Sequence, residues 1–329
     1  MPRILIKSVS IVALCAGAVA GCASVPRRAA LPADGSAPQP RTLAQALQLD
    51  PIVPPERHTP ASESRGKPQL DSAVAVANDK PSNDRQWIPE HRLLASAEFD
   101  GDRATIHNIR NAEFFSYRDC LVDYYDKSYD LSKLRTVDFI MIPFNDARYL
   151  AHTMLTFGFE NGDYLGVSVE VRLEQGESYD AAIGLFNQFE LIYVVADERD
   201  LIRVRTEYRD VDVLIYRTKA TPEQARRLFV DIMRRVNKLK DEPEFYDTLS
   251  NNCTTNIARH INTLAPGSVP HDFRVLLPGY ADNLAYELGL IDNSLPFAEV
   301  RRRARVNDLA LRYKGDPHFS QRIRGEQVR

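Results

Sequence analysis

The order of strand-like and helix-like segments is the feature that most constrains the fold of this chain. Seven segments between residues 104 and 216 are rich in the β-branched and aromatic residues typical of strands. They are residues 104–109, 136–142, 151–159, 164–172, 189–196, 201–208 and 211–216. Helical signals follow, with Thr221-Pro222 opening a helix to about residue 240, another starting near Cys253 and a third at 279–288. This order predicts an α+β domain in which helices pack on an antiparallel sheet.

One pair of these strands is predicted to form a hairpin. Residues 160–163 read Glu-Asn-Gly-Asp, a turn-rich linker between the strands at 151–159 and 164–172. A turn centred near Asn161-Gly162 places His152 opposite roughly residue 170.

The start of the chain carries the pattern of a secretory leader. Residues 1–21 hold two early cations and an apolar run at 9–19 that is too short to span a bilayer. The ending Val-Ala-Gly before Cys22 resembles a bacterial lipobox, in which that cysteine is acylated and becomes the first mature residue. The alternative is an ordinary leader with an incidental cysteine. Since no aspartate follows Cys22, the resemblance implies an outer-membrane lipoprotein that faces the periplasm, with the membrane as its partner.

Composition divides the rest of the chain. Residues 22–84 are predicted to be a disordered tether after the acylated cysteine, because eleven of the chain's 20 prolines lie between residues 23 and 90. Residues 85–295 form the predicted globular domain. Residues 296–329 are short and charged, with nine Lys and Arg against four Asp and Glu, and predict a solvated basic helix or tail rather than a membrane span.

Several function classes have no support in the sequence. The formal charge is −3, and there is no basic-aromatic stripe typical of nucleic-acid binding. No CxxC pair, zinc-ligand spacing or phosphate-binding loop is present, so we expect no metal and no cofactor. The oligomeric state is left open.

Cys253 is the best candidate nucleophile. It follows Ser250, Asn251 and Asn252, which are all good N-cap residues, so a helix is predicted to begin at or just before it. Free backbone N–H groups and the positive end of the helix dipole favour a thiolate at this position. The alternative is a small buried residue at a helix start.

A catalytic thiol needs a base, and His152 fits best. His260 lies seven residues after Cys253, roughly 10 Å along a helix, which is too far for a hydrogen bond. His152 instead interrupts an apolar strand pattern, and the predicted hairpin register brings Glu170 close enough to orient its ring. A histidine on the sheet surface and a solvated carboxylate are the alternatives.

Four stretches together resemble a known bacterial envelope family. They are residues 152–170, residues 189–200, the segment 245–256 that contains Asn-Asn-Cys-Thr-Thr, and Leu-Pro-Gly-Tyr-Ala at 277–281. The family is the one named for the N-terminal periplasmic domain of the lipoprotein N-acyltransferase Lnb. The resemblance covers residues 87–293 and implies a circularly permuted papain-like fold of the NlpC type, in which the histidine precedes the cysteine. The chain departs from Lnb proteins, which continue into a membrane-embedded C-terminal portion, because no segment after residue 295 could span a membrane.

The resemblance implies a thiol active site. Cys253 would attack a phospholipid or lipoprotein ester and form a thioester, and the acyl group would then pass to an amine or to water. His152 would act as the base, and Glu170 would orient its ring. The backbone N–H of Cys253 would help to bind the oxyanion, and Asn252 and Arg199 are weaker candidates for binding substrate.

The alternative functions are a cell-wall peptidase or amidase of the NlpC type and a non-catalytic envelope-binding module. Arg199 belongs to a charged turn, residues 197–200, that more often forms salt-bridged corners, with Arg203, Arg205 and Arg209 as candidate partners. A disulfide between Cys120 and Cys253 would abolish the thiol chemistry and stays open at this point.

Overall fold

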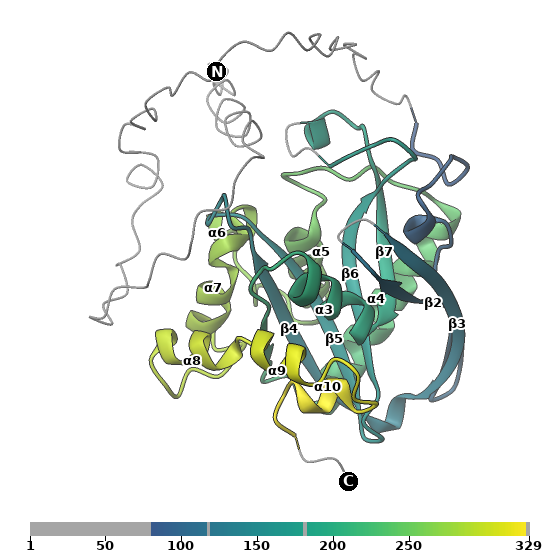
Figure 1. The fold of residues 1–329 in the computed structure, drawn as a ribbon. Helices are drawn as coiled ribbons and strands as arrows, with labels where there is room; N and C mark the ends of the chain where they lie inside the picture. Colours follow the sequence, from purple (N-terminus) through teal and green to yellow (C-terminus); the bar gives the residue numbers. More distant parts are fainter. Residues whose placement is uncertain (1–79, 117–118, 180–182, 327–329) are drawn as a thin grey trace, which may run out of the picture. The chain divides into compact units, whose positions relative to one another are not determined.

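The computed structural model describes residues 80–116, 119–179 and 183–326. The predicted leader at 1–21, the acylated Cys22 and most of the predicted tether lie outside these residues. Within them, eight strands form one sheet in the order β1-β2-β7-β6-β5-β4-β8, with β3 paired to β2 (Figure 1). The strands are β1 (Ser96–Asp100), β2 (Arg103–Phe114), β3 (Cys120–Asp130), β4 (Leu134–Pro143), β5 (Ala151–Phe159), β6 (Tyr164–Arg172), β7 (Glu190–Asp197) and β8 (Leu214–Arg217).

Helices follow and flank this sheet, which confirms the predicted α+β class with a mostly antiparallel sheet. Only the contact between β2 and β7, at Arg110 and Ala196, is parallel among the described pairings. The α-helices are α3 (Glu198–Arg203), α4 (Pro222–Asp241), α5 (Cys253–Leu264), α6 (Phe273–Leu276), α7 (Ala281–Glu287), α8 (Phe297–Ala304), α9 (Asn307–Arg312) and α10 (Phe319–Arg322). The short 3-10 and π-helical turns are η1 (Pro89–His91), η2 (Leu131–Lys133), η3 (Ile183–Leu185), η4 (Val204–Tyr208, π-helical) and η5 (Pro278–Tyr280). No helix in the described part of the chain has the length and hydropathy to cross a membrane.

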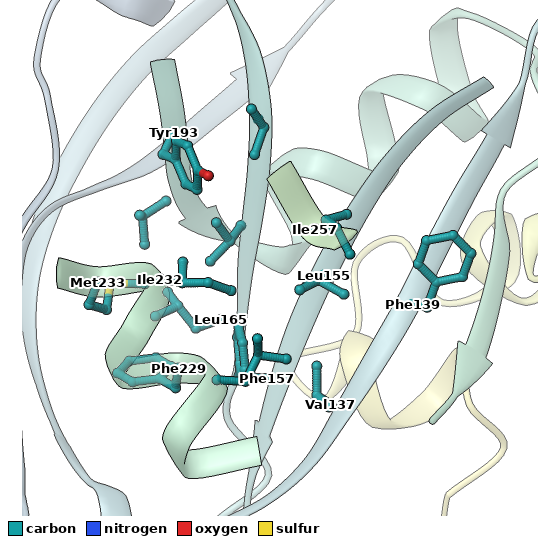
Figure 2. Close-up of a cluster of buried hydrophobic side chains, with 14 of the residues drawn as sticks. Val137, Phe139, Leu155, Phe157, Leu165, Tyr193, Phe229, Ile232, Met233 and Ile257 are labelled. Atoms are coloured by element: carbon teal, nitrogen blue, oxygen red, sulfur yellow. The ribbon is translucent and has the colours of Figure 1, made fainter. Parts of the chain in front are cut away.

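The sheet is buried on both faces, which explains why its central strands are apolar at nearly every position. Phe139 of β4 and Phe157 of β5 point to the face covered by α4 and α5, where they pack with Phe229 and Ile257 (Figure 2). On the other face, alternate residues of the same strands, such as Ile140 and Met154, pack against α3, α9 and α10. The packing on the α4 and α5 face holds α5 against β5.

Two predicted elements agree closely with the structure. The hairpin joins β5 and β6 in the predicted register, with Met154 opposite Ser168 and a turn at Gly162, whose φ is +85°. The helix opened by Thr221 is α4, and Thr221 and Gln224 form a capping box at its start.

One predicted strand is wrong. Residues 201–208 are helical, because Asp197 caps α3 by accepting from the Arg199 N–H, and the chain then continues into η4. Leu201, Ile202 and Val204 are all buried. The periodicity of such a short apolar run cannot distinguish a buried helix from a strand. The neighbouring prediction at 211–216 is shifted, since β8 begins at Leu214. The prediction also lacks β1, β3 and α6.

Both ends of the domain differ from the predicted boundaries. Ser82 and Asn83, assigned to the tether, already bond the domain, the first through Glu190 and the second through Arg172. Residues 297–326 are not one solvated helix. They form α8, α9 and α10, which bury side chains such as Phe319 against the sheet and place Arg324 in ion pairs with Asp138 and Glu198.

Candidate active site

The thiol of Cys253 lies at the first position of α5, as the capping residues predict. Asn252 is the N-cap, and its side-chain oxygen accepts from the Thr255 N–H while the Thr255 hydroxyl accepts from the Asn252 N–H. The backbone N–H groups of the first helical turn have no intrahelical partner and point toward the N-terminus of α5, where Cys253 lies. Cys253 itself is buried, with 6% of its surface exposed.

His152 and Thr153 of β5 stabilise the Cys253 thiolate. Burial raises the pKa of Cys253, but a hydrogen bond from His152, the charge of its ring, and hydrogen bonds from the Thr153 side chain and backbone outweigh this. The pKa of Cys253 consequently falls to about 6. The β5–β6 pairing ends at Met154 and Ser168, which leaves the edge of β5 at Thr153 available to the thiolate. The structure therefore brings together Cys253 and the histidine proposed as its base.

A serine that the sequence reading did not single out connects His152 to Glu170. His152 Nε2 lies 2.6 Å from Ser168 Oγ, and the Ser168 hydroxyl donates to Glu170 Oε1 at 2.7 Å. Since Ser168 gives its proton to the carboxylate, its oxygen accepts from His152 Nε2–H. This arrangement leaves Nδ1 as the nitrogen that faces Cys253. The direct distance from His152 Nε2 to Glu170 Oε1 is 3.6 Å, so Ser168 carries the contact.

Glu170 is held as a carboxylate by groups from four other elements. Burial raises its pKa, but His91 and the charges of Arg205, His152 and Arg110 bring the pKa of Glu170 well below its usual range. Arg205 lies in η4 and reaches Glu170 Oε1 at 3.2 Å. His91 Nδ1 accepts from the Leu173 N–H, so its Nε2–H faces Glu170 Oε2 at 3.8 Å.

The sequence reading missed Ser168, His91 and Arg205. Ser168 precedes Glu170 by two residues and so shares its strand face, which was a usable signal. Arg205 was assigned to a strand, and nothing in the sequence connects His91 to residue 170.

An apolar cavity of about 300 Å³ lies beside the site. Phe139 and Leu155 of the sheet line it together with Ile257 of α5 and Leu284 of α7. Thr254 is part of its wall, and the Thr254 hydroxyl lies 3.7 Å from the Cys253 sulfur. The thiol is therefore one side chain away from an apolar space.

The weaker candidates have structural partners. The Asn252 amide caps α5 and donates to the Thr248 carbonyl at 2.7 Å, so both ends of its side chain are engaged. Arg199 donates to the Asp316 carbonyl at 2.8 Å, and its guanidinium lies 5.7 Å from the Phe319 ring centre. No described contact joins Arg199 to Cys253.

The rest of the charged turn forms salt-bridged corners with partners other than those expected. Asp200 pairs with Arg110, and Glu198 pairs with Arg324. The expected partner Arg203 instead bonds Glu207, four residues further along the chain.

Other candidate groups lie outside the site. His260 bonds Asp231 through Nδ1 at 2.6 Å and the Tyr193 hydroxyl through Nε2 at 2.9 Å, so it serves a separate buried network. Cys120 and Cys253 are both free thiols, and the disulfide considered above is not formed. In residues 80–116, 119–179 and 183–326, no three His, Cys, Asp or Glu side chains are grouped as metal ligands would be.

Comparison with known proteins gives one family match. The model of the Lnb N-terminal periplasmic domain matches residues 121–279, a range that contains His152, Glu170 and Cys253. No curated protein and no solved structure matches the chain. The matching family model is the one that the sequence motifs indicate, and the match spans residues 121–279.

Proposed function

We propose that this domain is a papain-like thiol enzyme of the permuted NlpC type, which transfers or hydrolyses acyl groups of phospholipid or lipoprotein esters. The observation that carries the proposal is the thiol of Cys253, whose pKa is lowered to about 6 at a helix N-terminus beside His152. A cysteine with this setting is largely thiolate at neutral pH. The order of the two residues, with histidine before cysteine, supports the permuted fold.

The proposed reaction has two steps. The Cys253 thiolate attacks the ester carbonyl, and the N–H of Cys253 donates to the oxyanion. As the C–O bond breaks, His152 gives its proton to the leaving alkoxide, and a thioester remains on Cys253. In the second step His152 takes a proton from an amine or water that attacks the thioester, and the thiolate leaves. Through Ser168, Glu170 holds the imidazole in the tautomer that this exchange requires.

The apolar cavity favours an acyl ester over a peptide as substrate. Its walls are mainly aliphatic side chains, and it approaches the thiol through Thr254. A fatty acyl chain is stabilised by burial in such a space, at roughly 0.8 kcal/mol per CH₂. A cell-wall peptide would instead need polar partners along an open cleft.

Mass spectrometry after incubation with envelope phospholipids or a diacylated lipopeptide tests this function. We expect an acyl adduct on Cys253, or release of lyso-lipid, and we expect Cys253→Ser to abolish both. Cys120→Ser serves as the matched control and should retain them. If neither adduct nor Cys253-dependent release occurs with either substrate, the proposed reaction is wrong.

A non-catalytic envelope-binding module is the second candidate, and the burial of Cys253 favours it. In that case, lipid would bind the cavity with equal affinity in wild type and Cys253→Ser, and no covalent adduct would form.

We further propose that Cys22 is acylated and anchors the chain to the outer membrane. The supporting observation is the lipobox-like sequence before it. Cys22→Ala should move the protein from the membrane fraction to the soluble fraction. Unchanged membrane association of the variant would show that the anchor lies elsewhere.

A further inference from the structure

The site lies at one end of the sheet, here called the thiol end. The backbone pairs of Pro143 with Ala151 and of Arg172 with Glu190 mark this end of β4, β5, β6 and β7. Three connections end there: residues 144–150, the described parts 173–179 and 183–189 of the β6–β7 connection, and residues 242–252 before Cys253. Backbone hydrogen bonds join two of these connections to neighbouring segments. The Thr248 N–H donates to the Gly184 carbonyl, and the Gly279 N–H, just after α6, donates to the Tyr149 carbonyl.

Exposed apolar side chains are concentrated on these connections. Single exposed hydrophobics are normal on protein surfaces. Of the twelve large ones in the described residues, however, six lie on the three connections or on the α6–η5 segment bonded to them, with 38% to 60% of their surface exposed. They are Phe144, Tyr179, Phe186, Leu249, Leu276 and Tyr280, and together we call them the apolar rim.

The rim belongs to well-packed backbone. A β-carbon at Gly279 would clash with the Arg148 carbonyl oxygen, so the α6–η5 segment is packed tightly against residues 144–150. The Tyr280 ring lies 6.5 Å from Phe273, and that of Tyr179 lies 6.1 Å from Tyr246. Because the segments that carry the rim are held in place, contact with an apolar phase costs little further ordering entropy.

The chain also enters the domain at the thiol end. Arg172 donates to Asn83 Oδ1 at 2.9 Å, and the Ser82 N–H donates to Glu190 Oε1 at 3.1 Å. The polypeptide that leads from the predicted acylated Cys22 therefore reaches the domain beside the rim. The chain from a lipid anchor at Cys22 would join the domain at this end rather than at the opposite one.

We infer that the apolar rim is a bilayer-docking surface, which inserts between phospholipid headgroups and holds the thiol end against the membrane. The inference rests on the proposed function, since a lipid substrate must leave the bilayer to reach a buried thiol. Tyrosine favours the headgroup region, where its ring lies in an apolar layer and its hydroxyl is hydrated, and phenylalanine and leucine supply apolar area that is buried beside it. Binding through this surface depends on apolar contact and should persist in high salt.

Vesicle flotation tests the inference. The protein is residues 23–329, which lack Cys22, carrying Cys253→Ser so that no thioester contributes. The vesicles contain phosphatidylethanolamine and phosphatidylglycerol. The rim variant Phe144→Ser/Phe186→Ser/Leu276→Ser is compared with Phe99→Ser/Phe115→Ser/Leu311→Ser, a control matched in residue type whose exposures are 38%, 61% and 49% against 38%, 60% and 45%.

We expect the parent protein to float with vesicles in low and high salt, the rim variant to bind at least about tenfold more weakly, and the control to stay within about twofold. The single variant Phe186→Ser repeats the test if the triple variant does not fold. Three results overturn the inference: no flotation of the parent protein, equal loss in rim and control variants, or loss of binding in high salt, which would assign binding to charged residues. Parent protein that elutes as a dimer without binding vesicles would assign the rim to a second copy of the chain.

The outcome is separable from that of the proposed function. Flotation by the rim without an acyl adduct on Cys253 leaves the docking surface in place and removes the chemistry. An adduct formed by a protein that does not float does the reverse.

Discussion

Cys253 and Cys120 are two free thiols of one domain with opposite electrostatic environments. Burial raises the pKa of both. At Cys120, which begins β3, the carboxylate of Glu90 adds to burial and the pKa rises to about 12. At Cys253, His152 and Thr153 outweigh burial and the pKa falls to about 6. The comparison teaches that the charge and donors beside a thiol, rather than its burial, decide whether it is a nucleophile.

The largest expected effect is the difference in alkylation rate between the two thiols. At pH 6.5, most of Cys253 is thiolate, whereas almost none of Cys120 is, because their pKa values are about 6 and about 12. The intrinsic nucleophilicity of a thiolate falls with its pKa, which returns part of this factor. We expect iodoacetamide to modify Cys253 roughly 10²- to 10³-fold faster, as measured by peptide mass spectrometry. Equal rates would mean that the two environments do not differ as described.

The next effect concerns the carboxylate that supports the site. Glu170→Gln leaves Arg205 and His91 facing a neutral amide, and we expect the free energy of unfolding at pH 7 to fall by about 1–3 kcal/mol. The low pKa of Glu170 in the fold means that its contribution is present above its unfolded pKa near 4.3 and is lost as pH falls below that value. The difference from wild type in urea unfolding should therefore shrink between pH 5 and pH 3. Glu98→Gln, at a carboxylate that is 80% exposed, should stay within about 0.5 kcal/mol of wild type at both pH values.

Ser168→Ala tests the link between His152 and Glu170. The variant removes the acceptor of His152 Nε2–H, so the ring loses its fixed tautomer and orientation. We expect alkylation of Cys253 at pH 6.5 to slow by about tenfold, equivalent to about 1.4 kcal/mol. Ser168→Thr keeps a hydroxyl and should recover part of the rate. An unchanged rate in the alanine variant would remove Ser168 from the site.

The smallest effect sharpens the comparison from the side of Cys120. Glu90→Gln removes a negative charge that disfavours the Cys120 thiolate, so the pKa of Cys120 should fall and its alkylation rate rise by about threefold to tenfold. The rate at Cys253 should not change. If Cys120 does not respond, burial alone accounts for its high pKa.

The sequence was most informative where local rules act. Neighbouring residues determine the cap at Asn252, the capping box at Thr221 and the turn at Asn161-Gly162. That turn sets the strand register that brings His152 near Glu170. The environment of Cys120 could not be predicted, because Glu90 reaches it from a segment thirty residues earlier. The same applies to Arg205, whose helix was read as a strand.

The C-terminal segment illustrates the same limit. Its charge predicted a solvated helix, yet Phe319 and Ile323 are buried and Arg324 completes ion pairs with Asp138 and Glu198. The charge density along a sequence does not show which Arg or Lys side chains form ion pairs with buried carboxylates on distant elements.

The pH dependence of Cys253 alkylation in wild type and His152→Ala tests the central claim most directly, namely that His152 lowers the pKa of Cys253. We predict a midpoint near pH 6 in wild type, from the pKa of about 6. In His152→Ala the midpoint should rise above the ordinary thiol value of about 8.5, because burial then acts without its main compensation. The same midpoint in both proteins, or a wild-type midpoint at or above about 8.5, would contradict the assignment of His152 as the partner of Cys253.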